Sequence, residues 1–228
     1  MRKIIPSITT AWENDWRGTI KKAKELGIKE LALFPTGLKR KERDSFYKAA
    51  KEGGIESAPL VHIRNDMDFD ELRFLIKEFK VQAFNIHTNA EYSHLYQYPE
   101  ELKKMIFIEN VYEPLDEKEI QEFGGICLDI THLENDRVLY PEKFKQNVSV
   151  LKRYPIGCNH ISSFPKEKRT DEIGYAHYDS HGLEDLSHLD YLKNYPESYF
   201  SQIIALELKE SIKRQLEAKE YIVKMLGF

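Results

Sequence analysis

Short apolar runs recur along the chain, and each is followed by a longer stretch of mixed polar and apolar residues. Each run has about five or six residues, the length expected for a strand that is buried on both faces of a parallel sheet. The runs cover residues 3–8, 30–34, 57–62, 82–87, 105–109, 125–129, 156–160 and 202–207. We therefore expect strands at regular intervals along the whole chain.

Between these runs, apolar residues return with the period of an amphipathic helix. Gly27 follows the first such segment as a helix-end signal. Asp116 and Asp185 are expected helix starts, because an Asp side chain can accept hydrogen bonds from the free N–H groups of a first turn. The clearest helical segments are 14–26, 70–79 and 211–226, the last with a weaker apolar stripe.

Strands that alternate with helices indicate an α/β fold with a parallel sheet. Eight such units in 228 residues give roughly 28 residues per unit, at the short end for a (β/α)8 TIM barrel. The competing fold is a doubly wound open sheet, which usually carries a Gly-rich phosphate-binding turn after its first strand. No such turn follows Ile8, so we expect a single TIM-barrel domain over residues 1–228.

The composition is that of a globular protein, with 41% hydrophobic and 32% charged residues, and this argues against long disorder. No apolar run approaches the ~20 residues of a membrane span, and the first residues turn polar before a signal-peptide core forms. Cys127 and Cys158 are too few for a disulfide framework. The formal charge of −4 does not suit a general nucleic-acid coat protein, although it allows a local basic site. We expect a cytoplasmic protein.

Ionisable residues stand at the ends of most of the apolar runs, where a TIM barrel places its active site. The run ends are His62, His87, Glu109, Asp129, His160 and Glu207. Two loops on the same rim add His132, Asp179 and His181. Because side chains alternate along a strand, one inward layer is expected below this rim. It consists of Leu60, Asn85, Phe107, Cys127, Cys158 and Ala205.

A buried ring of carboxylates and imidazoles is costly unless cations neutralise it, so we expect a metal site. Imidazoles and carboxylates without a thiolate suit Zn²⁺ first, and also Mn²⁺, Fe²⁺ or Co²⁺. The candidate ligands exceed the needs of one ion and suffice for two or three, with Glu109 and Glu207 as the expected bridging carboxylates. Adjacent metal ions can turn a bridging water into hydroxide and hold both oxygens of a phosphate ester under attack.

Several motifs resemble those of the xylose-isomerase-like TIM-barrel superfamily, which joins sugar isomerases and epimerases with the endonuclease IV type of apurinic/apyrimidinic (AP) endonuclease. The likeness covers essentially the whole chain. Its anchors are Ile108-Glu109-Asn110, residues 125–132, Asn159-His160, residues 179–182 and Ala205-Leu206-Glu207. The ligands resembling the set that both branches share are Glu109, Asp129, His160 and Glu207. Those resembling the rest of the trinuclear zinc site of the nuclease branch are His62, His87, His132, Asp179 and His181.

The resemblance implies an enzyme and leaves two activities open. The full ligand set favours a divalent-metal-dependent phosphoesterase of the AP endonuclease type, in which a metal-bound hydroxide, positioned or deprotonated by Glu207 or Glu109, attacks a phosphate ester. The alternative is a metal-dependent sugar or sugar-phosphate isomerase or epimerase, with a carboxylate or His132 moving the proton. A third interpretation is a non-catalytic barrel that binds metal or a partner.

The chain differs from the nuclease branch beside the predicted ligands. Ile161-Ser162-Ser163 follows His160, where that branch has Asn-Asp. Ser180 stands where the branch has Arg, and Leu208-Lys209 follows Glu207 in place of Thr-Pro. These differences leave all the predicted metal ligands in place. We therefore expect either a phosphorylated small molecule or damaged DNA as the binding partner.

Basic loop residues on the predicted catalytic rim favour an anionic substrate. The expected substrate-binding residues are Arg64, Lys39, Arg40, Lys166 and Lys168. Trp12, Tyr92 and Tyr112 follow other strands and could stack on a base or a sugar. No apolar face identifies an interface, so no membrane partner is expected and the oligomeric state is left open.

Overall fold

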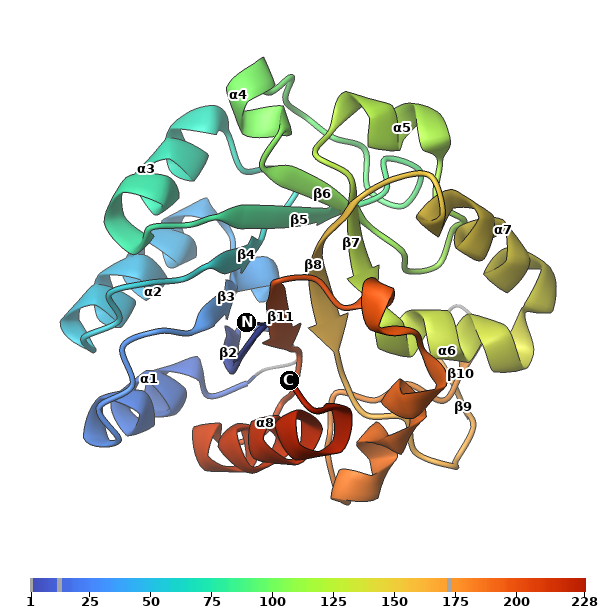
Figure 1. Ribbon diagram of the computed structural model, residues 1–228. Helices are drawn as coiled ribbons and strands as arrows, with labels where there is room; N and C mark the ends of the chain where they lie inside the picture. Colours follow the sequence, from blue (N-terminus) through green and yellow to red (C-terminus); the bar gives the residue numbers. More distant parts are fainter. Residues whose placement is uncertain (1, 12–13, 172–173) are drawn as a thin grey trace.

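A computed structural model describes residues 2–11, 14–171 and 174–228 of the chain. Within these residues one parallel sheet forms the centre of the molecule, with helices around it (Figure 1). Its strands are β1 (Lys3–Ile5), β2 (Ser7–Thr9), β3 (Ala32–Phe34), β4 (Leu60–His62), β5 (Ala83–His87), β6 (Ile106–Glu109), β7 (Ile126–Asp129), β8 (Ile156–Ile161) and β11 (Ile203–Leu206). The outer helices are α1 (Trp16–Glu25), α2 (Arg40–Glu52), α3 (Phe69–Phe79), α4 (Glu100–Lys103), α5 (Glu117–Glu122), α6 (Ile130–Leu139), α7 (Pro141–Leu151) and α8 (Ile212–Leu226).

The sheet closes into a barrel through its N-terminal strand, which Pro6 divides into β1 and β2. β1 pairs with β11, whereas β2 pairs with β3, so the two halves join the ends of the sheet. Pro6 has no N–H to donate, but its carbonyl accepts a hydrogen bond from the Ala32 N–H at 2.9 Å. With β1 and β2 taken as one strand, the described residues form the eight-stranded TIM barrel predicted from the sequence.

The order of strands around the barrel is β1/β2, β3, β4, β5, β6, β7, β8, β11. β4 and β8 are therefore four steps apart in either direction and lie across the barrel from each other. Loops that follow these two strands approach the mouth of the barrel from opposite sides.

Two apolar layers hold this arrangement together. The larger packs the outer face of the strands against the helices, and includes Leu33, Phe46 and Leu75. The smaller fills the barrel interior and consists of Ile5, Ala32, Phe34, Leu60, Ala83, Cys127, Cys158 and Ala205, with Phe107 packed against it. Five of the six residues predicted for the inward layer belong to this interior, and the sixth, Asn85, is buried with its side chain against Glu109. Both cysteines are buried thiols in this layer.

Helix starts agree with the capping signals in the sequence. Asp116 accepts a hydrogen bond from the Lys118 N–H at 2.9 Å as the N-cap of α5. Asp185 caps a 3₁₀ helix, η2 (Leu186–Asn194), where an ordinary helix start was expected. Gly27, just beyond α1, has a φ of +67°, a conformation that glycine adopts without steric cost.

A small antiparallel hairpin, β9 (Arg169–Thr170) with β10 (Ala176–His177), lies between β8 and η2 and has no counterpart in the sequence-based prediction (Figure 1). Its strands are two residues long, too short to produce an apolar period. No helix of the described residues has the length and apolar character needed to cross a membrane.

Candidate metal centre

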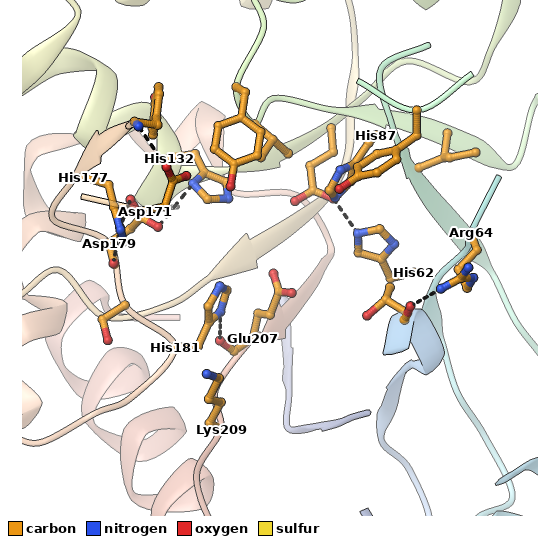
Figure 2. Close-up of a pocket in the computed structure, with 18 of the residues that line it drawn as sticks. His62, Arg64, His87, His132, Asp171, His177, Asp179, His181, Glu207 and Lys209 are labelled. Carbon is orange, nitrogen blue, oxygen red and sulfur yellow. Dashed lines mark hydrogen bonds and ion pairs between the residues drawn. The ribbon is translucent and has the colours of Figure 1, made fainter. Parts of the chain in front are cut away.

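A cavity of about 740 Å³ opens at the carboxyl ends of the barrel strands. The imidazoles that line it in the described part of the chain are those of His62, His87, His132, His177 and His181. Figure 2 shows His62 and His87 on one side of the cavity, His132 and His177 on the other, and Glu207 between them. The predicted ring of ionisable side chains is therefore assembled in one place.

Glu109, the last residue of β6, lies at the centre of this ring. Its Oε2 is 3.2 Å from His62 Nε2, and its Oε1 is 3.2 Å from His160 Nδ1. The Asn85 side chain donates a hydrogen bond to Oε2 at 2.6 Å and fixes the carboxylate further. The two oxygens of Glu109 thus face different imidazoles, which is the arrangement of a bridging carboxylate.

Two groups of possible ligand atoms share Glu109. In each group the ligand atoms lie within 4.8 Å of one another. One group is His62, His87 and Glu109, and the other is Glu109, Asp129, His160 and Glu207. The Cys127 thiol also lies within this distance of Glu109 and His160, but burial raises its pKa well above the usual value, so it stays a neutral thiol.

The first group presents ring nitrogens that local acceptors orient. His62 Nδ1 lies 3.1 Å from the carbonyl oxygen of Ile63, and this contact leaves Nε2 directed at Glu109. His87 Nδ1 lies 3.2 Å from the carboxylate of Glu91, an ion-pair contact without hydrogen-bond geometry. Acceptors behind ligating imidazoles are a general feature of metal sites.

The second group contains buried polar atoms without a hydrogen-bond partner among the described residues. Asp129 accepts the His132 N–H with Oδ1 at 2.8 Å as the N-cap of α6, while its Oδ2 has no such partner. His160 Nδ1 is 3.2 Å from Glu207 Oε2, and its Nε2 has no partner. Buried polar atoms of this kind are rare unless a ligand or ion completes them.

Charges in the cavity shift several pKa values. Burial would raise the pKa of Glu109, but the charges of His160 and His62 outweigh it and hold this pKa well below its usual value. The pKa of Glu207 falls to about 2, because His160 and His181 outweigh burial in the same way. Burial opposes protonation of His132, yet Asp129 and Asp179 raise its pKa to about 9. Despite burial, Glu109 and Glu207 also raise the pKa of His160 well above its usual value, so in the absence of metal the positive charges of His132 and His160 balance these carboxylates.

The three predicted loop ligands line the cavity near these groups without joining them. Among the described residues, the close sets of ligand atoms include none of His132, Asp179 and His181. His132 Nδ1 is 3.7 Å from Asp179 Oδ2, and His181 Nδ1 lies 2.9 Å from the Glu207 carbonyl oxygen. His177, which the sequence analysis missed, has Nδ1 3.5 Å from Asp179 Oδ1.

The donor set fits divalent metal ions. It combines imidazole nitrogens with carboxylate oxygens, it concentrates three buried carboxylates in one group, and it leaves Asp129 Oδ2 and His160 Nε2 unsatisfied. Such a set suits Zn²⁺, Mn²⁺, Fe²⁺ or Co²⁺. The described residues provide two compact groups of possible ligands that share Glu109, and the number of ions stays a prediction.

Of the five predicted substrate-binding residues, one lines the cavity of the described residues and four do not. Arg64 lines the cavity, and so do Tyr92 and Tyr112. Arg40 instead pairs with the buried Glu71 at 2.5 Å. The remaining predicted cations, Lys39, Lys166 and Lys168, are exposed and do not line the cavity of the described residues. Trp12 lies outside the described residues.

Other residues that line the cavity could not be predicted from the pattern of strands. Arg169 and His177 come from the β9–β10 hairpin, Tyr175 lies in its connection, and Lys209 follows β11. The Leu208-Lys209 departure from the nuclease branch could have pointed to Lys209, whereas the hairpin residues follow no recognisable period.

Comparison with solved structures shows low similarity to several barrel enzymes. N-acetylneuraminate lyase from Mycoplasma synoviae is 13% identical with a TM-score of 0.49, over 99% of this chain and 74% of that one. AP endonuclease, family 2, from Brucella melitensis is 10% identical with a TM-score of 0.44, over 100% and 99%. The 3-keto-D-glucoside 4-epimerase from E. coli is 11% identical with a TM-score of 0.44, over 98% and 100%.

A scan against protein-family models and a search of curated proteins find no match. At these identities and TM-scores the solved structures do not assign an activity, and the proposal below rests on the residues of this chain.

Proposed function

We propose that the chain is a divalent-metal-dependent phosphoesterase. The observation that carries this proposal is the shared carboxylate of Glu109, whose two oxygens face His62 and His160 in two adjoining ligand groups. Two neighbouring metal sites joined by a carboxylate are typical of enzymes that cleave phosphate esters.

Each ligand group supplies residues for one ion. His62, His87 and Glu109 would hold the first, and Glu109, Asp129, His160 and Glu207 the second. Bound metal ions would lower the pKa of a coordinated water and stabilise negative charge on the phosphate oxygens. Asn85 and Glu91 keep Glu109 and His87 in place for this task.

Glu207 and His132 are placed to assist two steps of ester hydrolysis, the attack of water and the departure of the leaving oxygen. The Glu207 side chain is 11% exposed, against 2% for Glu109, so we assign Glu207 as the carboxylate that positions the attacking water. His132 lines the cavity and has a pKa raised to about 9, so it can donate a proton to the leaving oxygen when the P–O bond breaks. Arg64 would hold the phosphate.

The proposal is tested by metal-dependent cleavage. Protein stripped with a chelator and reloaded with Zn²⁺, Mn²⁺ or Co²⁺ should hydrolyse bis-p-nitrophenyl phosphate, or DNA that contains an abasic site. Glu109→Gln should reduce the rate about 100-fold or more, whereas Lys77→Gln on the outer face of α3 should leave it unchanged. Failure of every reloaded form to cleave any phosphate ester would refute the proposal.

A sugar or sugar-phosphate isomerase or epimerase is the second candidate. It is favoured by the group Glu109, Asp129, His160 and Glu207, in which Asp129 Oδ2 and His160 Nε2 have no hydrogen-bond partner among the described residues, and which could hold one ion without the first group. In that case His62 and His87 would contact substrate. Exchange of a substrate C–H proton with solvent in a panel of ketoses and their phosphates, retained with one ion per chain, would favour this candidate over the phosphoesterase.

A further inference from the structure

Cations of fixed charge line the cavity on two opposite sides. Besides the imidazoles, the cavity of the described residues contains Arg64, Arg169 and Lys209. Arg64 follows β4, whereas Arg169 lies in the hairpin after β8, and β4 and β8 face each other across the barrel. Figure 2 shows Glu207 between Arg64 and the side that carries His177 and Asp179. The candidate metal centre therefore lies between the two groups of cations.

Arg64 is held in position before any substrate binds. Its Nε donates a hydrogen bond to Asp66 Oδ1 at 2.9 Å, and its Nη1 donates to the Thr36 carbonyl at 2.5 Å. Asp66 in turn accepts a hydrogen bond at 3.1 Å from Arg43, which is fully buried. A guanidinium fixed in this way loses little conformational freedom when it binds a phosphate.

Arg169 and Lys209 form the opposite group. Arg169 Nη1 donates a hydrogen bond to Ser180 Oγ at 3.1 Å, so the guanidinium is tied to the segment that carries Asp179 and His181. The Lys209 N–H donates to the His181 carbonyl at 2.7 Å and brings this lysine to the same segment.

We infer that Arg169 and Lys209 form a subsite for a second phosphate group of the substrate, across the metal centre from Arg64. This inference rests on the proposed function for the reacting phosphate and adds the substrate class: a small molecule with two phosphate groups. A phosphate between two like charges relieves their repulsion and accepts charge-assisted hydrogen bonds from both. The measurements below use a nucleoside and a sugar as the scaffold between the phosphates.

Binding measurements test the subsite without requiring turnover. Calorimetry on the metal-loaded protein compares thymidine 5′-monophosphate with thymidine 3′,5′-bisphosphate, and fructose 6-phosphate with fructose 1,6-bisphosphate. In at least one pair the bisphosphate should bind about tenfold tighter or more, and the pair that shows this gain identifies the scaffold.

Single substitutions locate the effect. Arg169→Met and Lys209→Met should each remove most of the gain from the second phosphate and leave monophosphate affinity and metal content unchanged. Glu184→Gln, which removes a negative charge from the same wall, should increase the gain. Lys213→Met, an exposed lysine in α8 outside the cavity lining, makes the same charge change and should alter nothing.

The outcomes separate this inference from the proposed function. Equal affinity for both members of each pair, or a gain that survives both Arg169→Met and Lys209→Met, would overturn the subsite even if the enzyme hydrolyses phosphate esters. A gain that these substitutions remove would establish the subsite even in a protein that hydrolyses no ester.

Discussion

Glu91 Oε2 lies 3.2 Å from His87 Nδ1, a ring nitrogen of a predicted metal ligand. The other oxygen of Glu91 accepts the backbone N–H groups of Tyr112 and Glu113 at 2.7 and 2.9 Å. One carboxylate thus joins the loop after β5 to the loop after β6 and orients a predicted ligand. Carboxylates in this position fix the tautomer and the direction of ligating imidazoles.

Glu91→Gln should weaken metal binding at the group of His62, His87 and Glu109. The substitution keeps an oxygen for the two backbone N–H groups but removes the charge beside His87, so we expect about 10- to 100-fold lower Zn²⁺ affinity. Competition with a chromophoric chelator measures this affinity. Glu101→Gln, at an exposed residue that pairs with Arg73 on the surface, is the control. Unchanged affinity in Glu91→Gln would show that the contact does not support the site.

The stability of the metal-free protein should depend on pH in two directions. The pKa values of Glu207 and Asp179 are lowered to about 2, so their contribution is present above about pH 4 and is lost as the pH falls toward 2. The pKa of His132 is raised to about 9, so its contribution is present below about pH 6.5 and is lost as the pH rises through 9. This second loss amounts to at most about 3 kcal/mol.

Thermal unfolding of chelated protein from pH 3 to 10 checks this expectation, with greatest stability between about pH 4 and 6.5. Metal ions bind deprotonated imidazole, so the stabilisation by added Zn²⁺ should grow as the pH rises from 6 to 8. A metal-free protein that becomes more stable between pH 6.5 and 9 would contradict the proposed balance of charges.

Asp66→Asn should impair phosphate binding through Arg64. The Arg64 guanidinium loses its carboxylate partner at 2.9 Å, while the metal ligands are untouched. We expect a KM for phosphate esters about tenfold higher, with kcat and metal content near those of the unmodified protein. Asp66→Glu should restore part of the affinity. Asp44→Asn, which alters an exposed surface pair with Arg40, should leave KM unchanged. Equal KM values for the two asparagine variants would exclude a positioning role for Asp66.

Gln215→Leu should destabilise the closure of the barrel. The buried Gln215 amide accepts the Ser7 N–H at 2.7 Å and donates to the Ser7 and Glu210 carbonyls at 3.1 and 3.0 Å. Leucine has similar volume but leaves these backbone groups unpaired, so the free energy of unfolding should fall by about 2–4 kcal/mol. Urea denaturation measures this change, and Gln121→Leu, at an exposed residue of α5, is the control. A loss below about 1 kcal/mol would refute this role for Gln215.

The strand pattern predicted the barrel and the position of the ring of ligands, because both follow from period and from the rule that strand ends face the active site. Glu109 and His160 are examples, since each lies at or next to the end of its strand. Asp129 and His132 lie close together because Asp129 is the N-cap of α6 and accepts a hydrogen bond from the His132 N–H in the first turn of this helix.

Contacts between loops could not be read from the sequence. Glu91 acts through a neighbouring loop, and Arg169 reaches Ser180 from a hairpin whose strands have two residues each. Ser180 stands where the nuclease branch has Arg. Here the guanidinium of Arg169, from the hairpin, donates a hydrogen bond to Ser180. Arg40 was assigned to the substrate, yet it begins α2 and its side chain pairs with Glu71.

The central claim, a pair of metal ions joined by Glu109, is tested most directly by elemental analysis of protein purified without chelator. The account predicts two zinc-like ions per chain in the unmodified protein, one in His62→Ala, and a marked loss of both in Glu109→Gln. A single ion per chain that His62→Ala does not affect would contradict it and favour the isomerase candidate.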